Sequence, residues 1–138
     1  MIVTLANQTL TDKMMELCTE LLQQESYQSL RAMVDQFVKD EAAIQQYERF
    51  LRHQQALEQK EERQQKLTAE EISEYEQEEM ALYDNPVIRK YLHAEAEFNK
   101  FHRFISQFYM KTIELQRLPE LSELKKEGCG CGGSCGGH

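Results

Sequence analysis

Glycine is absent from the first 127 residues of the sequence, and all six glycines lie between Gly128 and Gly137. Tryptophan is also absent, and proline occurs only twice. Sandwiches and barrels need turn residues at frequent intervals, so this scarcity argues against an all-β fold. The sequence predicts an all-α protein, an antiparallel helical bundle or long helical hairpin, in residues 1–127, with a flexible Gly/Cys-rich tail in residues 128–138.

Long apolar runs and an excess of basic residues are missing as well. No stretch approaches the roughly 20 apolar residues that a membrane-spanning helix needs, and the apolar residues at the N-terminus are too few for a signal peptide. We therefore expect a cytoplasmic protein without a membrane partner. The formal net charge is −8, whereas affinity for nucleic acid comes mostly from Lys and Arg that neutralise phosphates. Direct nucleic-acid binding is not expected.

Apolar residues at intervals of three and four predict consecutive helices, and polar residues mark where these helices begin. We expect Thr9 or Thr11 to cap the first helix and Ser26 to cap the second. Asp40 is the expected cap of a third, longer helix. The body of the chain thus begins with short amphipathic helices.

The segment 58–66 contains only Glu, Gln, Lys and Arg. These residues favour helix but have nothing to bury, so we expect a helix end that projects into water as the tip of a hairpin. Thr68 and Glu71 then match a capping box, which predicts that the chain turns back into a new helix. Its run of glutamates, residues 70–79, is interpreted as a solvated face.

Asn85-Pro86 predicts the start of the last and most apolar helix. Its expected core stripe consists of Val87, Tyr91, Ala94, Phe98, Phe101, Ile105, Phe108, Thr112 and Leu115. Ile88, Leu92 and Phe104 widen this stripe toward a second face, which predicts a self-association surface. We expect Pro119 to end or kink the helix, with one short turn after it.

The tail holds three of the four cysteines, Cys129, Cys131 and Cys135, and ends in His138. In a reducing cytosol, clustered thiols serve metals or redox chemistry more often than disulfides. The glycines between them permit the tight backbone curvature that wrapping a metal centre requires. We therefore predict Cys129, Cys131 and Cys135 as ligands of an iron–sulfur cluster or metal ion, and His138 as a further metal ligand.

Three thiolates are one fewer than a structural zinc or a four-iron cluster usually takes. The missing ligand could be His138, Cys18, an external ligand or a residue of another chain, and we favour another chain because the tail alone offers little preorganisation. A lone cysteine on an apolar helix stripe usually packs as a small hydrophobe, so Cys18 is expected in the core. The alternative for the tail is an inert Gly/Ser-type linker.

No motif of a known catalytic site occurs in residues 1–127. His53, His93 and His102 are dispersed without a second histidine or a cysteine at ligand spacing, so surface or rim positions are expected. A phosphate-binding glycine loop and a nucleophile elbow are both missing from the sequence. The sequence thus predicts a protein that is not an enzyme.

The helix pattern over roughly residues 9–117, the polar hairpin and the segment 85–99 resemble the YlbF/YmcA (Com_YlbF) family of small bacterial regulators. The Gly/Cys-rich end resembles that of YlbF-type members. The resemblance implies a complex with a YmcA-type homologue and a YaaT-type partner that together hold iron–sulfur clusters. For this chain we expect a 4Fe-4S cluster that is shared with a partner. It further implies action with the endoribonuclease RNase Y in mRNA processing, with competence, sporulation and biofilm development as outputs.

The leading hypothesis is therefore a regulatory scaffold that assembles as a homo-oligomer or with homologues and contacts RNase Y only indirectly. One alternative is a small carrier that binds zinc or Cu(I) through the same thiolates, because soft ligands in a mobile tail suit metal transfer. Another alternative is a helical interaction module whose tail is inert.

Overall fold

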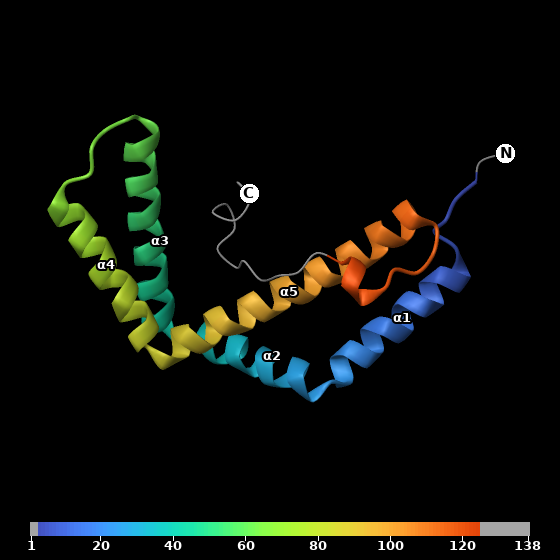
Figure 1. Cartoon of the computed structure of the whole chain (residues 1–138). Helices are drawn as coiled ribbons and strands as arrows, with labels where there is room; N and C mark the ends of the chain where they lie inside the picture. Colours follow the sequence, from blue (N-terminus) through green and yellow to red (C-terminus); the bar gives the residue numbers. More distant parts are fainter. Residues whose placement is uncertain (1–2, 125–138) are drawn as a thin grey trace. The chain divides into compact units, whose positions relative to one another are not determined.

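The computed structural model describes residues 3–124, and this part of the chain is all-α, as predicted (Figure 1). The helices are α1 (Gln8–Gln23), α2 (Glu25–Val38), α3 (Glu41–Glu62), α4 (Ala69–Asp84), α5 (Pro86–Leu115) and the 3₁₀ helix η1 (Leu121–Glu123). The chain divides into two compact units, the first ending at Ala94 and the second beginning at Glu95. The predicted boundary between residues 127 and 128 lies outside the described residues.

The first helix is capped by Asn7, and the prediction that Thr9 or Thr11 caps it is wrong. The Asn7 side chain accepts a hydrogen bond of 3.0 Å from the backbone amide of Leu10. The Thr11 hydroxyl instead donates to the Asn7 carbonyl at 2.8 Å. Asparagine caps a helix at least as well as threonine, so the earlier of the competing residues sets the start of α1.

The predicted Ser26 cap is also wrong, because α2 already begins at Glu25. Gln24 alone separates α1 from α2, and its extended backbone (φ −68°, ψ 134°) breaks the helix. The Gln24 side chain makes no capping hydrogen bond. Ser26 therefore lies within the first turn of α2, past the N-cap position, which Gln24 occupies.

The predicted hairpin is formed by α3 and α4, which lie side by side (Figure 1). Asp40 caps α3 by accepting a hydrogen bond of 3.0 Å from the Ala43 amide. Thr68 and Glu71 form the predicted capping box of α4, with hydrogen bonds of 3.0 and 3.1 Å. The polar segment 58–66 forms the end of α3 and the tip of the hairpin, as expected.

At the tip, Gln64 takes a left-handed conformation (φ 59°) that a glycine usually occupies. Its amide donates to the Glu61 carbonyl, and the amide of Gln65 donates to the Lys60 carbonyl. These two bonds form a Schellman motif, which satisfies carbonyls that the end of α3 would otherwise leave without partners. The chain thus makes this turn without a glycine.

The core of the first unit lies where α2, α3, α4 and the start of α5 meet. It consists of the buried residues Phe37, Ala43, Phe50, Leu82 and Ile88. The Phe37 ring stacks on Tyr91 with a centroid distance of 4.0 Å and meets Tyr47 edge-on at 5.9 Å. Aromatic pairs of this kind contribute beyond the area that they bury.

The last helix begins as predicted, because the Asn85 side chain accepts from the amides of Val87 at 3.0 Å and Ile88 at 3.4 Å. The expected core stripe is correct only in part. Ile88, which was placed on the second face, is fully buried, and Ala94 is the last buried residue of α5. Ile105 of the predicted stripe is 36% exposed.

In the second unit, α5 ends at Leu115, before Pro119. Gln116 takes a left-handed conformation (φ 58°), which commonly follows the end of an α-helix. The predicted short turn is present as η1, and it is held by two hydrogen bonds of 2.9 Å from the Arg117 guanidinium to the Glu123 carboxylate. Among the described helices, none combines the length and the apolar character that crossing a membrane requires.

Candidate functional site

The predicted ligands Cys129, Cys131, Cys135 and His138 lie outside the described residues. Their role as cluster or metal ligands stays a prediction. Within residues 3–124, no three His, Cys, Asp or Glu side chains form a group that could hold a metal ion.

Cys18 is exposed on α1, so its expected core position is wrong. The apolar side of α1 is uncovered in the described part of the first unit, where α1 has no buried residue. Cys18 lines an open hollow together with Leu10, Thr11, Met14 and Met15. Helical spacing identified the apolar side of α1 correctly, but it cannot show whether another helix covers that side.

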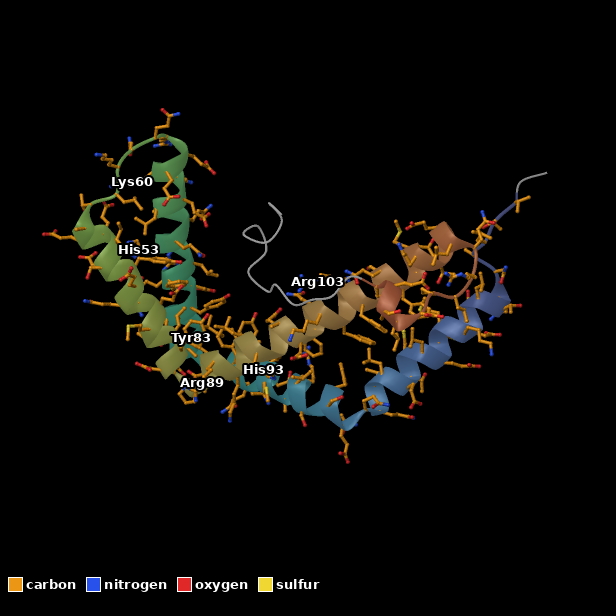
Figure 2. All side chains as sticks on the ribbon, in the orientation of Figure 1. His53, Lys60, Tyr83, Arg89, His93 and Arg103 are labelled. Carbon is orange, nitrogen blue, oxygen red and sulfur yellow. The ribbon has the colours of Figure 1, made fainter. Side chains whose placement is uncertain are left out.

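The three helical histidines differ in their surroundings. His93 and His102 are exposed, as expected from the sequence. Figure 2 shows the position of His93 on α5. His53 on α3 is half-buried, and its Nδ1 lies 2.9 Å from Oε1 of Glu78 on α4. The two partners are 25 positions apart in the sequence, so spacing within one helix could not reveal the pair.

Polar contacts connect α3 and α4 along the hairpin, in addition to the His53–Glu78 pair. The Gln54 amide donates to the Tyr75 hydroxyl at 3.0 Å. Closer to the tip, Lys60 of α3 (Figure 2) places its Nζ 2.6 Å from a carboxylate oxygen of Glu71, which is also the capping-box residue. An ionic contact thus joins the two helices near the tip of the hairpin.

The Lys60–Glu71 contact predicts a pH dependence of stability. The hydrogen bond from Lys60, followed by those from Thr68, lowers the pKa of Glu71 from 4.5 to about 2. Because the carboxylate is favoured in the folded state, its stabilising effect is complete above about pH 4.5 and is lost as the pH falls toward 2. Urea unfolding at a series of pH values measures this effect. We expect Glu71→Gln to have a lower free energy of unfolding than the unchanged protein at pH 7 and to lose less of it as the pH falls through this range.

The matched control for this experiment is Glu70→Gln, because Glu70 is the exposed neighbour in the same helical turn. We expect Glu70→Gln to keep the acid sensitivity of the unchanged protein. An equal loss of stability between pH 4.5 and 2 in Glu71→Gln and in the unchanged protein would contradict the assigned role of Glu71.

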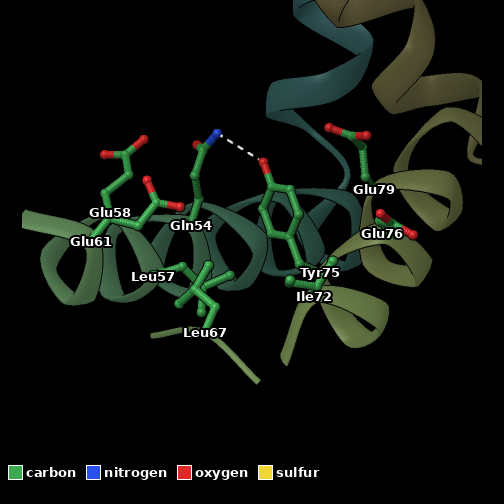
Figure 3. Close-up of a pocket in the computed structure, with 9 residues that line it drawn as sticks. All are labelled: Gln54, Leu57, Glu58, Glu61, Leu67, Ile72, Tyr75, Glu76 and Glu79. Carbon is green, nitrogen blue, oxygen red and sulfur yellow. Dashed lines mark hydrogen bonds between the residues drawn. The ribbon is translucent and has the colours of Figure 1, made fainter. Parts of the chain in front are cut away.

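Beside the Gln54–Tyr75 contact, α3 and α4 line an open hollow of about 520 Å³ (Figure 3). Its floor is apolar, and four carboxylates surround it. We call it the acidic groove, and its lining is Gln54, Leu57, Glu58, Glu61, Leu67, Ile72, Tyr75, Glu76 and Glu79. Glu58 and Glu61 come from α3, whereas Glu76 and Glu79 come from α4. Periodicity does not indicate which helices pair, so the sequence could not reveal the groove.

The electrostatics of the acidic groove are visible in the pKa of Tyr75. Burial raises this pKa, and the nearby negative charges of Glu79 and Glu58 raise it further, whereas the hydrogen bond from Gln54 lowers it. Carboxylates from both helices thus act on one phenol at the groove.

Large apolar side chains are exposed in each unit. In the first unit they cover α1, where Leu10, Met14, Met15, Leu17 and Leu22 are all more than 40% exposed. In the second unit they follow α5 and include Phe104, Ile105, Tyr109, Met110 and Ile113. Contiguous exposed apolar side chains often mark interaction surfaces. Self-association stays a prediction, and buried Ile88 is not part of these surfaces.

The fold and the site define a small all-α protein built on a helical hairpin. Residues 10–114 match the family described as "Control of competence regulator ComK, YlbF/YmcA", and the chain therefore belongs to the YlbF/YmcA family. This family controls the competence regulator ComK. Comparisons with curated proteins and with solved structures found no match. The match ends before Cys129, so the cysteine-rich YlbF subtype stays a prediction.

Proposed function

We propose that this chain is a non-enzymatic regulatory scaffold. It assembles with homologous partners, contributes Cys129, Cys131 and Cys135 to an iron–sulfur cluster shared with a partner, and modulates RNase Y-dependent mRNA processing. The observation that carries the regulatory part is the match of residues 10–114 to a family that controls ComK. Competence, sporulation and biofilm development are the proposed outputs.

The chemistry of the tail's donor set supports the cluster. Three thiolates within seven residues, separated by glycine and serine, are soft anionic ligands on a backbone that can bend around a centre. A four-iron cluster takes four such ligands, so a partner chain would supply the fourth. When bound, the cluster would tie the tail to that partner.

The exposed apolar surfaces support assembly. α1 presents its apolar side without a buried residue, and the second unit exposes Tyr109, Met110 and Ile113 by about 60% each. Burial of such side chains against a homologue removes apolar area from water, which is the main driving force of association. The proposed partners are a second copy and YmcA-type and YaaT-type proteins.

A second candidate function, a small zinc or Cu(I) carrier, is favoured by the same soft donors together with His138. In this function the tail binds a single metal ion in place of a cluster and transfers the ion to another protein. The third candidate, a helical interaction module with an inert tail, requires only the exposed apolar surfaces.

Anaerobic purification after co-expression with YmcA-type and YaaT-type proteins tests the proposed function. We expect a brown complex with sulfur-to-iron charge-transfer absorbance and bound iron, because the shared cluster forms only when the partner's ligands are present. The chain expressed alone is the control and should hold less iron.

Two results of this purification would count against the scaffold. A colourless complex that contains zinc would support the carrier instead. A chain that sediments as a monomer and binds neither homologue would contradict assembly, whatever its metal content.

A further inference from the structure

We propose that the acidic groove docks a basic amphipathic segment of a protein partner. An apolar side chain of that segment inserts between α3 and α4, and its lysines or arginines face the carboxylates on both sides. This surface is separate from the proposed cluster, because the hairpin contains no cysteine.

The shape of the groove suits an inserted side chain. Leu57 is 8% exposed and closes the floor, whereas Ile72 is 44% exposed and offers apolar area to an occupant. The volume of about 520 Å³ lies within the range of roughly 300–1,000 Å³ that is typical of ligand pockets. Burying exposed apolar side chains against the occupant's anchor would supply affinity.

The charges determine which occupant fits. Each helix contributes two carboxylates three positions apart, Glu58 with Glu61 and Glu76 with Glu79, so the apolar floor has negative charge on both sides (Figure 3). Within residues 3–124, none of these four forms an ion pair with Lys, Arg or His. Complementary charges steer association and fix the register of a bound segment, so cations are expected on both sides of the anchor.

The nearest lysine in the sequence does not neutralise this rim. Lys60 precedes Glu61 directly, but its ammonium group is engaged with Glu71. The carboxylates of the rim therefore lack an ion pair with Lys60 and remain available to a partner's cations.

A second copy of the chain is a poor occupant, because its 24 Asp and Glu outnumber its 16 Lys and Arg, and six of those cations already have carboxylate partners. These are Lys13, Arg31, Lys60, Lys100, Lys111 and Arg117. The net charge of −8 also opposes the approach of a second copy to an acidic surface. The charge complementarity therefore favours a basic segment of a different protein.

The test uses the full chain and a fluorescent synthetic peptide with leucines on one helical face and lysines on the other. We expect saturable binding in fluorescence anisotropy, weakened by added salt. The double variant Glu58→Lys with Glu79→Lys should weaken binding about tenfold or more, because like charges then face the peptide. A peptide with glutamates in place of the lysines should not bind.

The matched control is Glu48→Lys with Glu74→Lys, which changes the net charge equally and also takes one exposed residue from each helix. We expect it to change affinity by less than about twofold, because the altered charges lie outside the groove. Ile72→Ser tests the apolar half of the site and should also weaken binding. Circular dichroism would confirm that each variant is folded.

Several outcomes would overturn the proposal. If both double variants weakened peptide binding equally, the peptide would be attracted by overall charge and not by a site. If Ile72→Ser left the affinity unchanged, insertion of an apolar side chain between α3 and α4 would be contradicted. Spermine that displaces the peptide would assign the groove to small polycations. A groove variant that alters the sedimentation of the chain alone would assign it to a second copy. The triple Cys→Ser variant should bind the peptide normally, which separates this test from that of the cluster.

Discussion

Replacing Phe37 with alanine is expected to lower the free energy of unfolding by about 3–5 kcal/mol, the usual cost of removing a buried phenylalanine. Phe37 is 7% exposed and joins α2 to α3 and α5 through its contacts with Tyr47 and Tyr91. The variant loses the apolar transfer free energy, leaves a cavity and removes the stacked pair. Domains of this size are stable by only about 5–15 kcal/mol, so much of the stability would be lost.

Urea unfolding at neutral pH measures this effect, and Val38→Ala is the matched control. Val38 is the next residue of the same helix but is 55% exposed. Its truncation should change stability by no more than about 0.5 kcal/mol, as for most surface substitutions. Equal effects of the two substitutions would contradict the position of the core at Phe37.

The second large effect is expected for Cys129→Ser, Cys131→Ser and Cys135→Ser together. Serine keeps the size of the side chain but replaces a soft thiolate with a hydroxyl that remains protonated, so the proposed ligands are lost. We expect the complex purified without oxygen to contain almost no iron and to lose its colour. Iron and sulfide analysis with the absorption spectrum measures both.

Cys18→Ser is the control for this variant, because Cys18 is exposed on α1 and far in sequence from the tail. Retention of iron in Cys18→Ser would also exclude Cys18 as the missing fourth ligand. If the triple variant kept both its metal content and its complex, the metal proposals would be wrong, and the inert-tail interaction module would remain.

Local signals explain the parts of the fold that the sequence predicted well. Asp40, the Thr68–Glu71 capping box and Asn85-Pro86 each satisfy backbone amides within a few residues of themselves. Such interactions depend little on the rest of the fold, so the starts of α3, α4 and α5 are readable from sequence. The hairpin follows from these starts and from the polar tip.

Contacts between distant residues explain what the sequence could not predict. Helical spacing gives α5 two adjacent apolar sides, but only packing against α2, α3 and α4 decides that Ile88 is buried in the core. The same limit applies to Cys18, since no pattern within α1 reveals whether its apolar side is covered. The acidic groove combines Glu58 with Glu79, which line the same hollow only because α3 pairs with α4.

The polar contacts of the hairpin also set an order for its local unfolding. Phe50 and Leu82 anchor one end in the buried core, whereas Lys60 and Glu71 hold the other end through an ion pair that acid or salt weakens. Fraying should therefore begin at the tip and stop at Phe50, giving amide hydrogens of the tip the fastest exchange within the hairpin. The groove lies in this easily opened segment, so an occupant that bridges α3 and α4 would slow that exchange by holding the two helices together.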